Sequence, residues 1–453
     1  MENLFAEFKG ASLQDWKEKV VKDLKGQPFE VLLSEDDNHL SLEPFYNREN
    51  TATETATNRQ NPGWHMMQNI SVTDFVQANK EALKALNNGA DALCFDLRTL
   101  ETVDFSQLLR DIELSYIKVS FEIGHSYKTI IDSFEAFLKS KNLDSSQQNI
   151  AFHFDPTGNY MAAPGGHPLP DGKNYPNFYE QSGRWFGLSV NAALYQNAGA
   201  NSVSQLAYAT AHVHEYIHWL QDVLPQGSEI SLNIQLATST LFFEEIAKLR
   251  ALPGLIQRLL QTYGFRPRLN FSVQTSDIYR SPVDVYTNLL RDSIAGMAAV
   301  IGGCHDLSIH AFNATQQNPK KSLENGQRLA LNQQLIFKEE SYLDKVADMA
   351  AGSFYIEKRT EELAQEAWRV FQAIEKEGGL LAYFALGNLK KDIQQQAADL
   401  LAQYRNGTRV LIGVNKFPNP MEEESAFLPK IQNADDNGLR PVNLAEELLK
   451  SGV

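Results

Sequence analysis

Segments with strand periodicity and segments with helical periodicity alternate along most of this 453-residue chain, and this alternation restricts the fold most strongly. Strands separated by helices favour parallel pairing, because each parallel connection needs a crossover. Eight such units over roughly 250 residues predict an α/β fold, a closed (β/α)8 TIM barrel. The predicted strands are 64–71, 92–97, 117–124, 149–155, 185–192, 229–237, 268–275 and 306–312.

The flanking segments predict extensions to the barrel. Ser12 can cap a helix that begins at Leu13, which gives the barrel an N-terminal helical arm. Residues 326–404 have mostly helical patterns and predict a C-terminal helical extension, followed by one more short strand at 409–417. The predicted division is an N-terminal arm at 1–45, a barrel domain with its extension at 46–420 and a C-terminal tail at 421–453.

The polar residues of the predicted strands indicate an unusual barrel axis. Parallel barrel strands usually have continuous apolar runs, whereas here polar and apolar residues alternate. In a closed barrel the apolar set must face the helices, so the polar set faces the lumen and predicts a wet or ligand-filled axis. The alternative is an antiparallel sheet with one solvated face. The candidate lumen-lining residues are Ser120, Glu122, His153, Asp155, Ser189, Asn191, Asn233, Gln235, Asn270, Ser272 and Gln274.

A different function is indicated by His214, Glu215 and His218 on a predicted helix. Two histidines four residues apart share one helix face and can ligate zinc, while the glutamate can take a proton from the bound water. Glu244 is a candidate third ligand, whereas His212 points off the shared face. The motif predicts a zinc hydrolase, but so short a motif often occurs by chance. The competing interpretation is that these are polar residues on the outer side of a barrel helix.

Charge and composition restrict the partners and the compartment. The formal net charge of −15 argues against nucleic acid and anionic membranes as partners. No apolar run has membrane-spanning length, and the first residues lack the pattern of a signal peptide, so a cytoplasmic protein is expected. The two cysteines, Cys94 and Cys304, are expected to be buried free thiols, because two are too few for a disulfide framework.

Several motifs occur in a fixed order along nearly the whole chain. They include Asn197-Ala198-Gly199-Ala200-Asn201 and the runs FFEEIAKLRA at 242–251, KEESxLDxVAD at 338–348, AGSFYIE at 351–357 and IGVNK at 412–416. Together they resemble the methylmalonyl-CoA mutase family, an adenosylcobalamin-dependent isomerase family. The likeness is to the barrel portion of the small (beta) subunit, without the cobalamin-binding domain.

The resemblance implies a barrel through which the pantetheine arm of an acyl-CoA threads along the axis, which fits a polar lumen. It also implies that this chain differs from the catalytic large subunit at two catalytic positions. Asn69 stands where that subunit has a catalytic tyrosine, and Leu194 stands where it has a catalytic histidine. Leucine can neither donate a hydrogen bond to a migrating carbonyl nor act as a general acid. No catalytic residue is therefore expected in this chain.

The resemblance also implies how cofactor and partner are distributed. The family's cobalamin module follows the barrel and ligates cobalt through Asp-x-His-x-x-Gly. The nearest match, at 305–310, has the wrong spacing, and the chain ends too soon after the barrel for another doubly wound domain. We therefore expect this chain to bind no cofactor and no metal, and a large catalytic subunit to bind adenosylcobalamin in a heterodimer.

The expected function is a non-catalytic small subunit in the conversion of succinyl-CoA to methylmalonyl-CoA, inactive as an isolated chain. A CoA ester is a candidate ligand of the lumen. Besides the zinc hydrolase, the remaining alternative is a stand-alone acyl-CoA-binding barrel.

Overall fold

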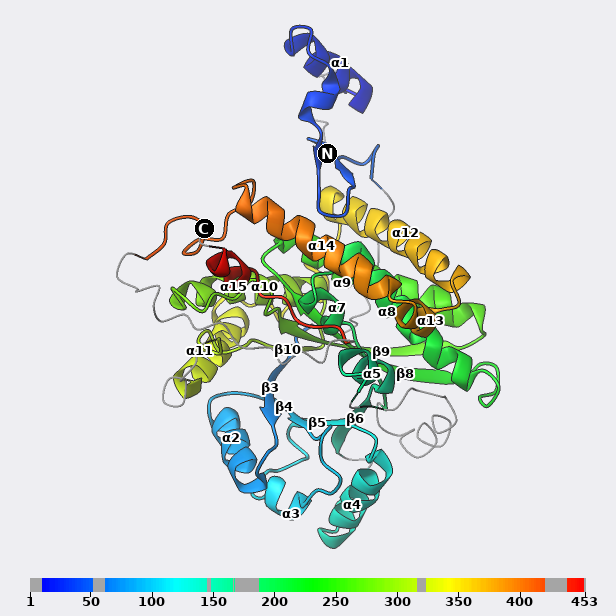
Figure 1. Ribbon diagram of the computed structural model, residues 1–453, viewed down its shortest axis with the longest axis vertical. Helices are drawn as coiled ribbons and strands as arrows, with labels where there is room; N and C mark the ends of the chain where they lie inside the picture. Colours follow the sequence, from blue (N-terminus) through cyan, green and yellow to red (C-terminus); the bar gives the residue numbers. More distant parts are fainter. Residues whose placement is uncertain are drawn as a thin grey trace, which may run out of the picture.

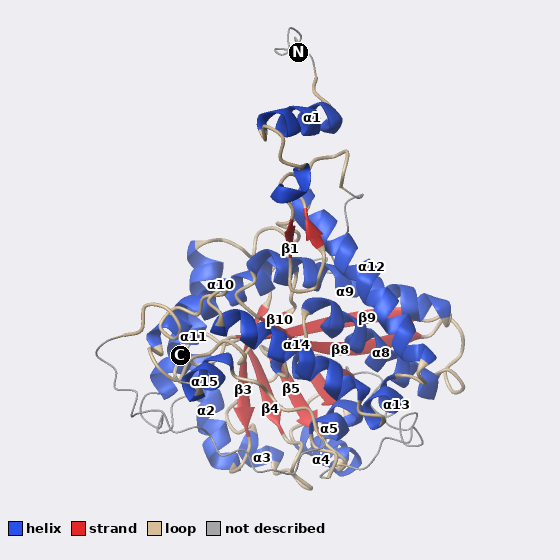
Figure 2. Ribbon diagram, turned by 45° about the horizontal axis from the view of Figure 1, so that its top comes forward, coloured by secondary structure: helices blue, strands red, loops and turns tan. Residues whose placement is uncertain are grey.

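A computed structural model describes residues 10–51, 62–144, 148–165, 167, 187–315, 323–419 and 438–451. Within them eight parallel strands close into a barrel in the order β10-β3-β4-β5-β6-β7-β8-β9, and helices surround it (Figure 1, Figure 2). The predicted α/β fold, a TIM barrel with an N-terminal helical arm and a C-terminal helical extension, is confirmed. The strands are β3 (His65–Ser71), β4 (Ala92–Asp96), β5 (Lys118–Ile123), β6 (Asn149–Phe154), β7 (Leu188–Asn191), β8 (Glu229–Thr238), β9 (Arg266–Thr275) and β10 (Asp306–Ser308).

Helices begin where short polar side chains can bind free backbone N–H groups. Asp74 accepts from the N–H of Gln77 at the start of α2, and Asn201 accepts from the N–H of Ser204 at the start of α8. The helices that accompany the barrel strands are α2 (Phe75–Asn87), α3 (Phe105–Leu108), α4 (Tyr127–Ser140), α5 (Pro156–Ala162), α7 (Ala193–Asn197), α8 (Ser202–Leu220), α9 (Phe242–Thr262) and α10 (Tyr286–Gly302). The later helices are α11 (Leu323–Leu335), the π-helix η3 (Ile336–Glu340), α12 (Phe354–Lys376), α13 (Leu380–Ala385), α14 (Asn388–Arg405) and α15 (Leu444–Lys450).

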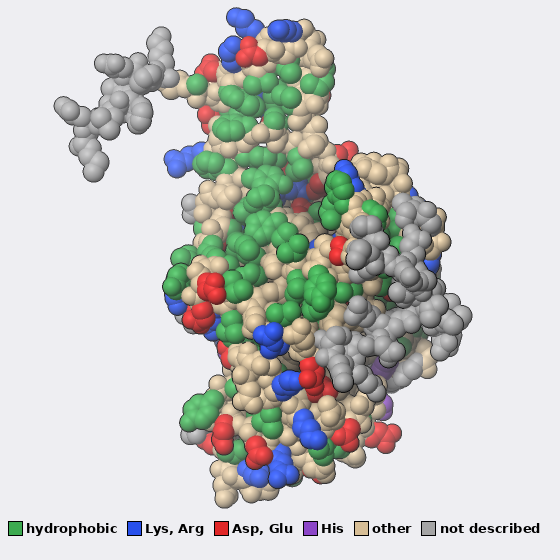
Figure 3. All heavy atoms as spheres, turned by 90° about the vertical axis from the view of Figure 1, so that its left-hand side faces the viewer, with side chains coloured by type: hydrophobic (Ala, Val, Ile, Leu, Met, Phe, Trp, Pro, Cys, Tyr) green, Lys and Arg blue, Asp and Glu red, His purple; other side chains and the backbone are tan. Residues whose placement is uncertain are grey.

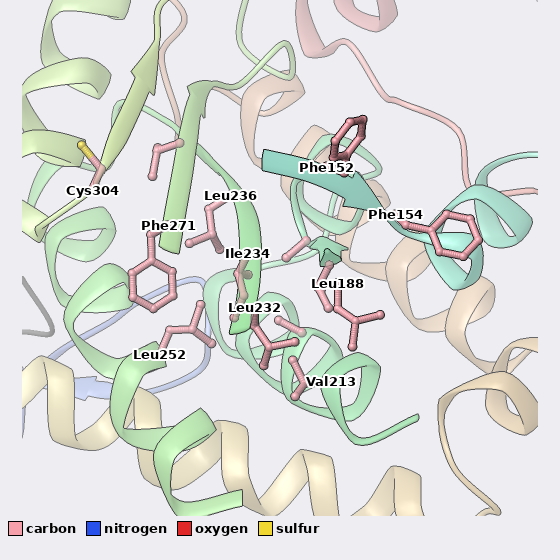
Figure 4. Close-up of a cluster of buried hydrophobic side chains, with 14 of the residues drawn as sticks. Phe152, Phe154, Leu188, Val213, Leu232, Ile234, Leu236, Leu252, Phe271 and Cys304 are labelled. Atoms are coloured by element: carbon pink, nitrogen blue, oxygen red, sulfur yellow. The ribbon is translucent and has the colours of Figure 1, made fainter. Parts of the chain in front are cut away.

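The core lies between the outer face of the barrel and the helices. Phe121 of β5 is fully buried, and its ring centroid lies 5.2–5.9 Å from those of Phe95, Phe105, Phe134 and Phe152. Figure 4 shows a further part of this core, in which buried side chains of β8 and β9 lie with residues of α8 and α9. The apolar members of the alternating strands therefore face the helices, as predicted.

The N-terminal arm stands clear of the barrel (Figure 1). Its helix α1 has no buried residue and begins with a capping box, in which Ser12 and Asp15 each accept a hydrogen bond from the other's backbone N–H. The base of the arm is fastened to the helical extension by the ion pairs Asp36–Arg359 and Asp37–Arg409. The arm contains α1 (Leu13–Asp23), the 3-10 helix η1 (Phe29–Leu32) and the antiparallel hairpin of β1 (Ser34–Glu35) and β2 (Ser41–Leu42).

The prediction of a short strand at 409–417 is wrong. The segment forms turns with one isolated bridge between Ile412 and Lys416. The Asn415 side chain closes it by donating to the carbonyls of Tyr404 and Arg409. Its apolar residues alternate as in a strand, but a closed barrel leaves no free edge for another strand to join.

The end of the chain crosses the barrel mouth. Residues 438–443, here called the C-terminal strap, donate backbone hydrogen bonds from Leu439 to Met161 and from Val442 to Asn197. Helix α15 follows and buries Leu444 and Leu448. Part of the predicted polar tail, residues 421–437, lies outside the described residues.

Two further predictions concern the membrane and the cysteines. Across the described parts of the chain no helix is both long and apolar enough to span a membrane. Cys94 and Cys304 are both buried, as predicted, and neither is part of a disulfide bond.

Candidate functional site

The parallel register brings the predicted lumen residues to the same face of neighbouring strands. Ser189 of β7 pairs with Asn233 of β8, which pairs with Asn270 of β9. One layer further along, Gln235 pairs with Ser272. Because partner residues of a parallel ladder share a face, these side chains meet along the axis.

A buried ion pair lies inside the barrel and joins the first residues of β5 and β10. Lys118 Nζ of β5 lies 2.7 Å from Asp306 Oδ2 of β10, and both side chains are at least nine-tenths buried. The same carboxylate oxygen accepts hydrogen bonds from Asn270 Nδ2 at 2.7 Å and from Ser272 Oγ at 2.8 Å. Asn233 Oδ1 accepts from Asn270 Nδ2 at 2.7 Å and lies 2.9 Å from Ser272 Oγ. The barrel axis is thus filled by a polar network of the protein's own side chains.

Neither end of this ion pair is among the candidate lumen residues predicted from the sequence. Lys118 and Asp306 both lie in predicted strands, where Lys118 is followed by apolar Val119 and Asp306 by apolar Leu307. That alternation was the only sign that either faces inward. Burial by itself would raise the pKa of Asp306, but Lys118 and the hydrogen bond from Asn270 outweigh it and hold the pKa well below its usual range. The aspartate is therefore ionised at neutral pH.

His153 of β6 lies beside this network as a neutral imidazole. Burial, and then the positive charge of Lys118, lower the pKa of His153 to about 3. Its Nδ1 has no hydrogen-bond partner among the described residues. With Met67, Cys94 and Gln235 it lines a cavity of about 20 Å³. That volume suits about one water molecule, so the polar axis holds a water-sized void rather than a channel at this level.

The next polar layer lies nearer the C-terminal end of the barrel. Glu122 accepts a hydrogen bond from Gln235 Nε2 at 2.8 Å and lies 3.3 Å from Arg98 Nε. Burial raises the pKa of Glu122. Arg98 also makes a bidentate contact with Asp96 at 2.6 and 2.8 Å. Sequence reasoning missed Asp96 and Arg98, because both stand at a strand end, where periodicity gives no signal.

Three other predicted lumen residues, Ser120, Gln274 and Asn191, make contacts outside the network around the ion pair. Ser120 Oγ donates to the carbonyl of Leu93, and Gln274 lines the 20 Å³ cavity. Asn191 Oδ1 accepts from the N–H of Leu194 at 3.3 Å, at the start of α7.

Asp155 does not join the axial network. Its carboxylate accepts from the N–H of Gly158 at 2.7 Å, from the N–H of Asn191 at 2.6 Å and from Tyr216 Oη at 2.5 Å. His212 Nε2 lies 3.0 Å away. Burial opposes ionisation, yet these partners, His212 foremost, lower the pKa of Asp155. The residue therefore caps α5 and ties the ends of β6 and β7 to α8.

The two positions where the resemblance implies catalytic groups lie at the barrel mouth. Asn69 is exposed at the end of β3 and lines a cavity of about 660 Å³ that is also lined by His310 and by Arg440 and Asn443. Leu194 of α7 is partly buried against the hydrophobic core. The next residue, Tyr195, fixes α7 through a 2.9 Å hydrogen bond to buried His212.

In the structure the residues of the predicted zinc motif do not all lie at one site. His214 Nδ1 lies 2.7 Å from Glu375 Oε2 of α12, and the ring of His218 lies 4.3 Å from that of His214. Glu215 instead accepts from the N–H of Leu381 at 3.0 Å. Glu244, the candidate third ligand, lies elsewhere: it accepts hydrogen bonds from Asn38 and Arg359. The histidines thus gather with a carboxylate that sequence reasoning did not select, because α12 lies far along the chain.

The low pKa of His153 predicts a specific loss of stability in acid. The unfolded chain takes up a proton near pH 6.5, whereas the folded protein does so only near pH 3. The folded protein therefore has its full unfolding free energy, as far as His153 is concerned, above pH 6.5. That free energy decreases as the pH falls from 6.5 toward 3, because only the unfolded chain takes up the proton. Between pH 7 and pH 5 the wild type should lose about 2 kcal/mol more unfolding free energy than His153→Asn. Urea unfolding at both pH values measures this, and equal losses would show that His153 is not buried in its neutral form.

Comparison with known proteins identifies the family. A family model described as methylmalonyl-CoA mutase matches residues 97–445. The methylmalonyl-CoA mutase small subunit of Porphyromonas gingivalis is 30% identical, over 98% of this chain and 76% of its own length. That of Streptomyces virginiae is 26% identical, over 94% of this chain and 74% of its own. The large subunit of Propionibacterium freudenreichii is 32% identical over 52% of this chain and 33% of its own length.

The chain spans about three quarters of the length of these two small subunits and a third of that of the large subunit. The match to the family model and the match to the Porphyromonas protein each cover most of the chain. The chain belongs to the methylmalonyl-CoA mutase family, a family of cobalamin-dependent isomerases.

Proposed function

We propose that the chain is a non-catalytic small subunit that pairs with a large subunit in the interconversion of succinyl-CoA and methylmalonyl-CoA. The observation that carries this proposal is the filled barrel axis. The Lys118–Asp306 ion pair, with Asn270 and Ser272 bound to it, occupies the path that the pantetheine arm of a CoA ester would take. Separating two buried charges costs several kcal/mol, so an acyl-CoA would have to displace a stable network.

The mouth of the barrel supports the same proposal. Asn69 offers an amide in place of a phenol, and Leu194 offers no polar group at all. Proton transfer and stabilisation of a developing charge both need a polar group within hydrogen-bond reach of the reacting atoms. Neither position supplies the group that the family's chemistry requires.

The described residues at the mouth do not fit a bound cobalamin. The C-terminal strap crosses the face that carries the 660 Å³ cavity and lines it with Arg440 and Asn443, held by the carbonyls of Met161 and Asn197. We therefore propose that adenosylcobalamin is bound by the large subunit and that this chain contributes no group to it.

The N-terminal arm is proposed as a contact to the large subunit. The arm stands clear of the body and carries hydrophobic side chains on its surface (Figure 1, Figure 3). Val21, Val31 and Phe45 are 44%, 51% and 43% exposed. Exposed hydrophobic clusters of this kind commonly mark protein interfaces, and a partner could bury them.

The test is reconstitution of the mutase from separately and jointly expressed subunits. We expect this chain to co-purify with the large subunit of the same organism, and the complex with adenosylcobalamin to convert succinyl-CoA. The isolated chain should give no turnover and no heat of binding with succinyl-CoA. Val31→Asp should weaken association at least tenfold, whereas Tyr116→Asp, at an 84% exposed site on the barrel, should not. Turnover by the chain alone would refute the non-catalytic role, and failure to co-purify would refute the pairing.

The two alternatives give distinct outcomes. Binding of CoA esters by the isolated chain would favour the stand-alone acyl-CoA-binding barrel. The zinc hydrolase is not favoured, because Glu215 is bound to the backbone of Leu381 and the family is one of isomerases.

A further inference from the structure

Two helices of the outer layer bring three metal-binding side chains together. His214 and His218 lie one turn apart on α8, and Glu375 lies in the last turn of α12. Figure 1 shows both helices on the outside of the barrel. One ligand atom from each residue lies within 4.8 Å of the others. The cluster is separate from the axial network and from the mouth.

The contact between His214 and Glu375 requires a hydrogen or a metal ion between the two facing atoms. His214 Nδ1 and Glu375 Oε2 are 2.7 Å apart, a distance at which a bare nitrogen lone pair and a carboxylate oxygen would repel each other. A proton on Nδ1 removes that repulsion, and so does a metal ion between the two atoms. For zinc, with bonds of ~2.0–2.2 Å, nitrogen and oxygen would separate to about 3.3 Å in a tetrahedral site.

We propose that His214, His218 and Glu375 bind one divalent transition-metal ion of the zinc class. Two imidazoles and a carboxylate suit zinc and leave a fourth position for water. Side-chain exposure is 10% for His214 and 24% for Glu375, while His218 is exposed. The cluster is therefore partly enclosed, and an ion can still enter from solvent beside His218.

The surroundings of His214 fit a ligand role. Its other ring nitrogen, Nε2, lies 2.5 Å from Tyr263 Oη. Ligating histidines commonly donate the second ring N–H to such a partner, which fixes the ring and leaves the first nitrogen free for metal. Phe371 of α12 packs edge-on against the same ring at 5.5 Å.

The ion has a structural role in this arrangement. A hydrolytic site needs a carboxylate near the metal-bound water, but Glu215 is bound to the backbone of Leu381 at the start of α13. The metal instead joins α8 to the end of α12, and so connects the barrel's outer helices to the C-terminal extension.

The test is zinc binding by the full chain, purified without a polyhistidine tag and freed of metal with a chelator. Calorimetry should show one equivalent of Zn²⁺ bound, and added Zn²⁺ should raise the midpoint of thermal unfolding. His218→Ala removes an exposed ligand, and Glu375→Gln keeps the shape of the third; each should weaken binding at least tenfold. His39→Ala is the matched control. His39 is exposed, and its Nδ1 lies 2.6 Å from Oε1 of Glu35, four residues before it. The His39→Ala variant should bind zinc as the wild type does.

Visible spectra with Co²⁺ give an independent measurement. The wild type should show the d–d bands of a site with low coordination number, and both ligand variants should lose them. Circular dichroism of the metal-free proteins establishes that the variants are folded. Absence of stoichiometric binding, or equal binding by wild type and His218→Ala (an adventitious ion only), would overturn the proposal.

Discussion

Replacing Asp306 with leucine is expected to lower the free energy of unfolding by about 3–5 kcal/mol. The change leaves the Lys118 ammonium group without its carboxylate at a site where its side chain is 8% exposed. It also removes the shared acceptor of Asn270 Nδ2 and Ser272 Oγ. Urea unfolding at neutral pH measures the loss.

A second variant separates charge from packing. Lys118→Met combined with Asp306→Leu should recover most of the loss, because replacing both buried charges by apolar groups is often neutral or stabilising. The matched surface control is Glu324→Ala, which breaks the exposed ion pair with Lys84 and should change stability by less than ~1 kcal/mol. If the double variant were as unstable as Asp306→Leu, the loss of stability would come from altered side-chain packing in the lumen and not from the unpaired Lys118 charge.

Phe121→Ala is expected to cost about 3–5 kcal/mol of unfolding free energy. Phe121 is fully buried, and its ring joins neighbouring strands to two helices through Phe95 and Phe152 on one side and Phe105 and Phe134 on the other. Removing it leaves a cavity that rigid barrel strands cannot collapse to fill. Denaturant unfolding measures the effect.

The control for this prediction is Tyr116→Ala. This aromatic side chain lies two residues before β5 and is 84% exposed, so its removal should change stability within ~0.5 kcal/mol. A loss below ~1.5 kcal/mol for Phe121→Ala would mean that the aromatic cluster relaxes around the vacancy.

The barrel could be predicted because each strand carries its own periodicity. Apolar residues such as Val119 and Phe121 alternate with Lys118 and Ser120, and that pattern needs no knowledge of distant residues. Where local pattern and tertiary context disagreed, the prediction failed. Residues 409–417 alternate like a strand, but the closed ring offers them no edge.

The partners within the site could not be predicted from local patterns. Lys118 and Asp306 are 188 residues apart in sequence and meet only because β5 and β10, which are separated by β3 and β4 in the ring, both turn these side chains into the lumen. The same holds for His214 and Glu375, which tertiary packing of α8 against α12 brings together. The alternation of Asp155 with Phe154 predicts a lumen position, but at the end of the strand the carboxylate binds α5 and α8 instead.

The C-terminal strap comes late in the chain, well after the last barrel strand ends at Ser308. During synthesis on the ribosome all eight strands are made before the strap, so the ring can close while its mouth is still uncovered. Release of the strap breaks hydrogen bonds such as those from Leu439 and Val442 and leaves the strand ladders intact. Opening of the mouth is therefore a local event, and amide hydrogens of the strap should exchange with solvent well before those of the barrel.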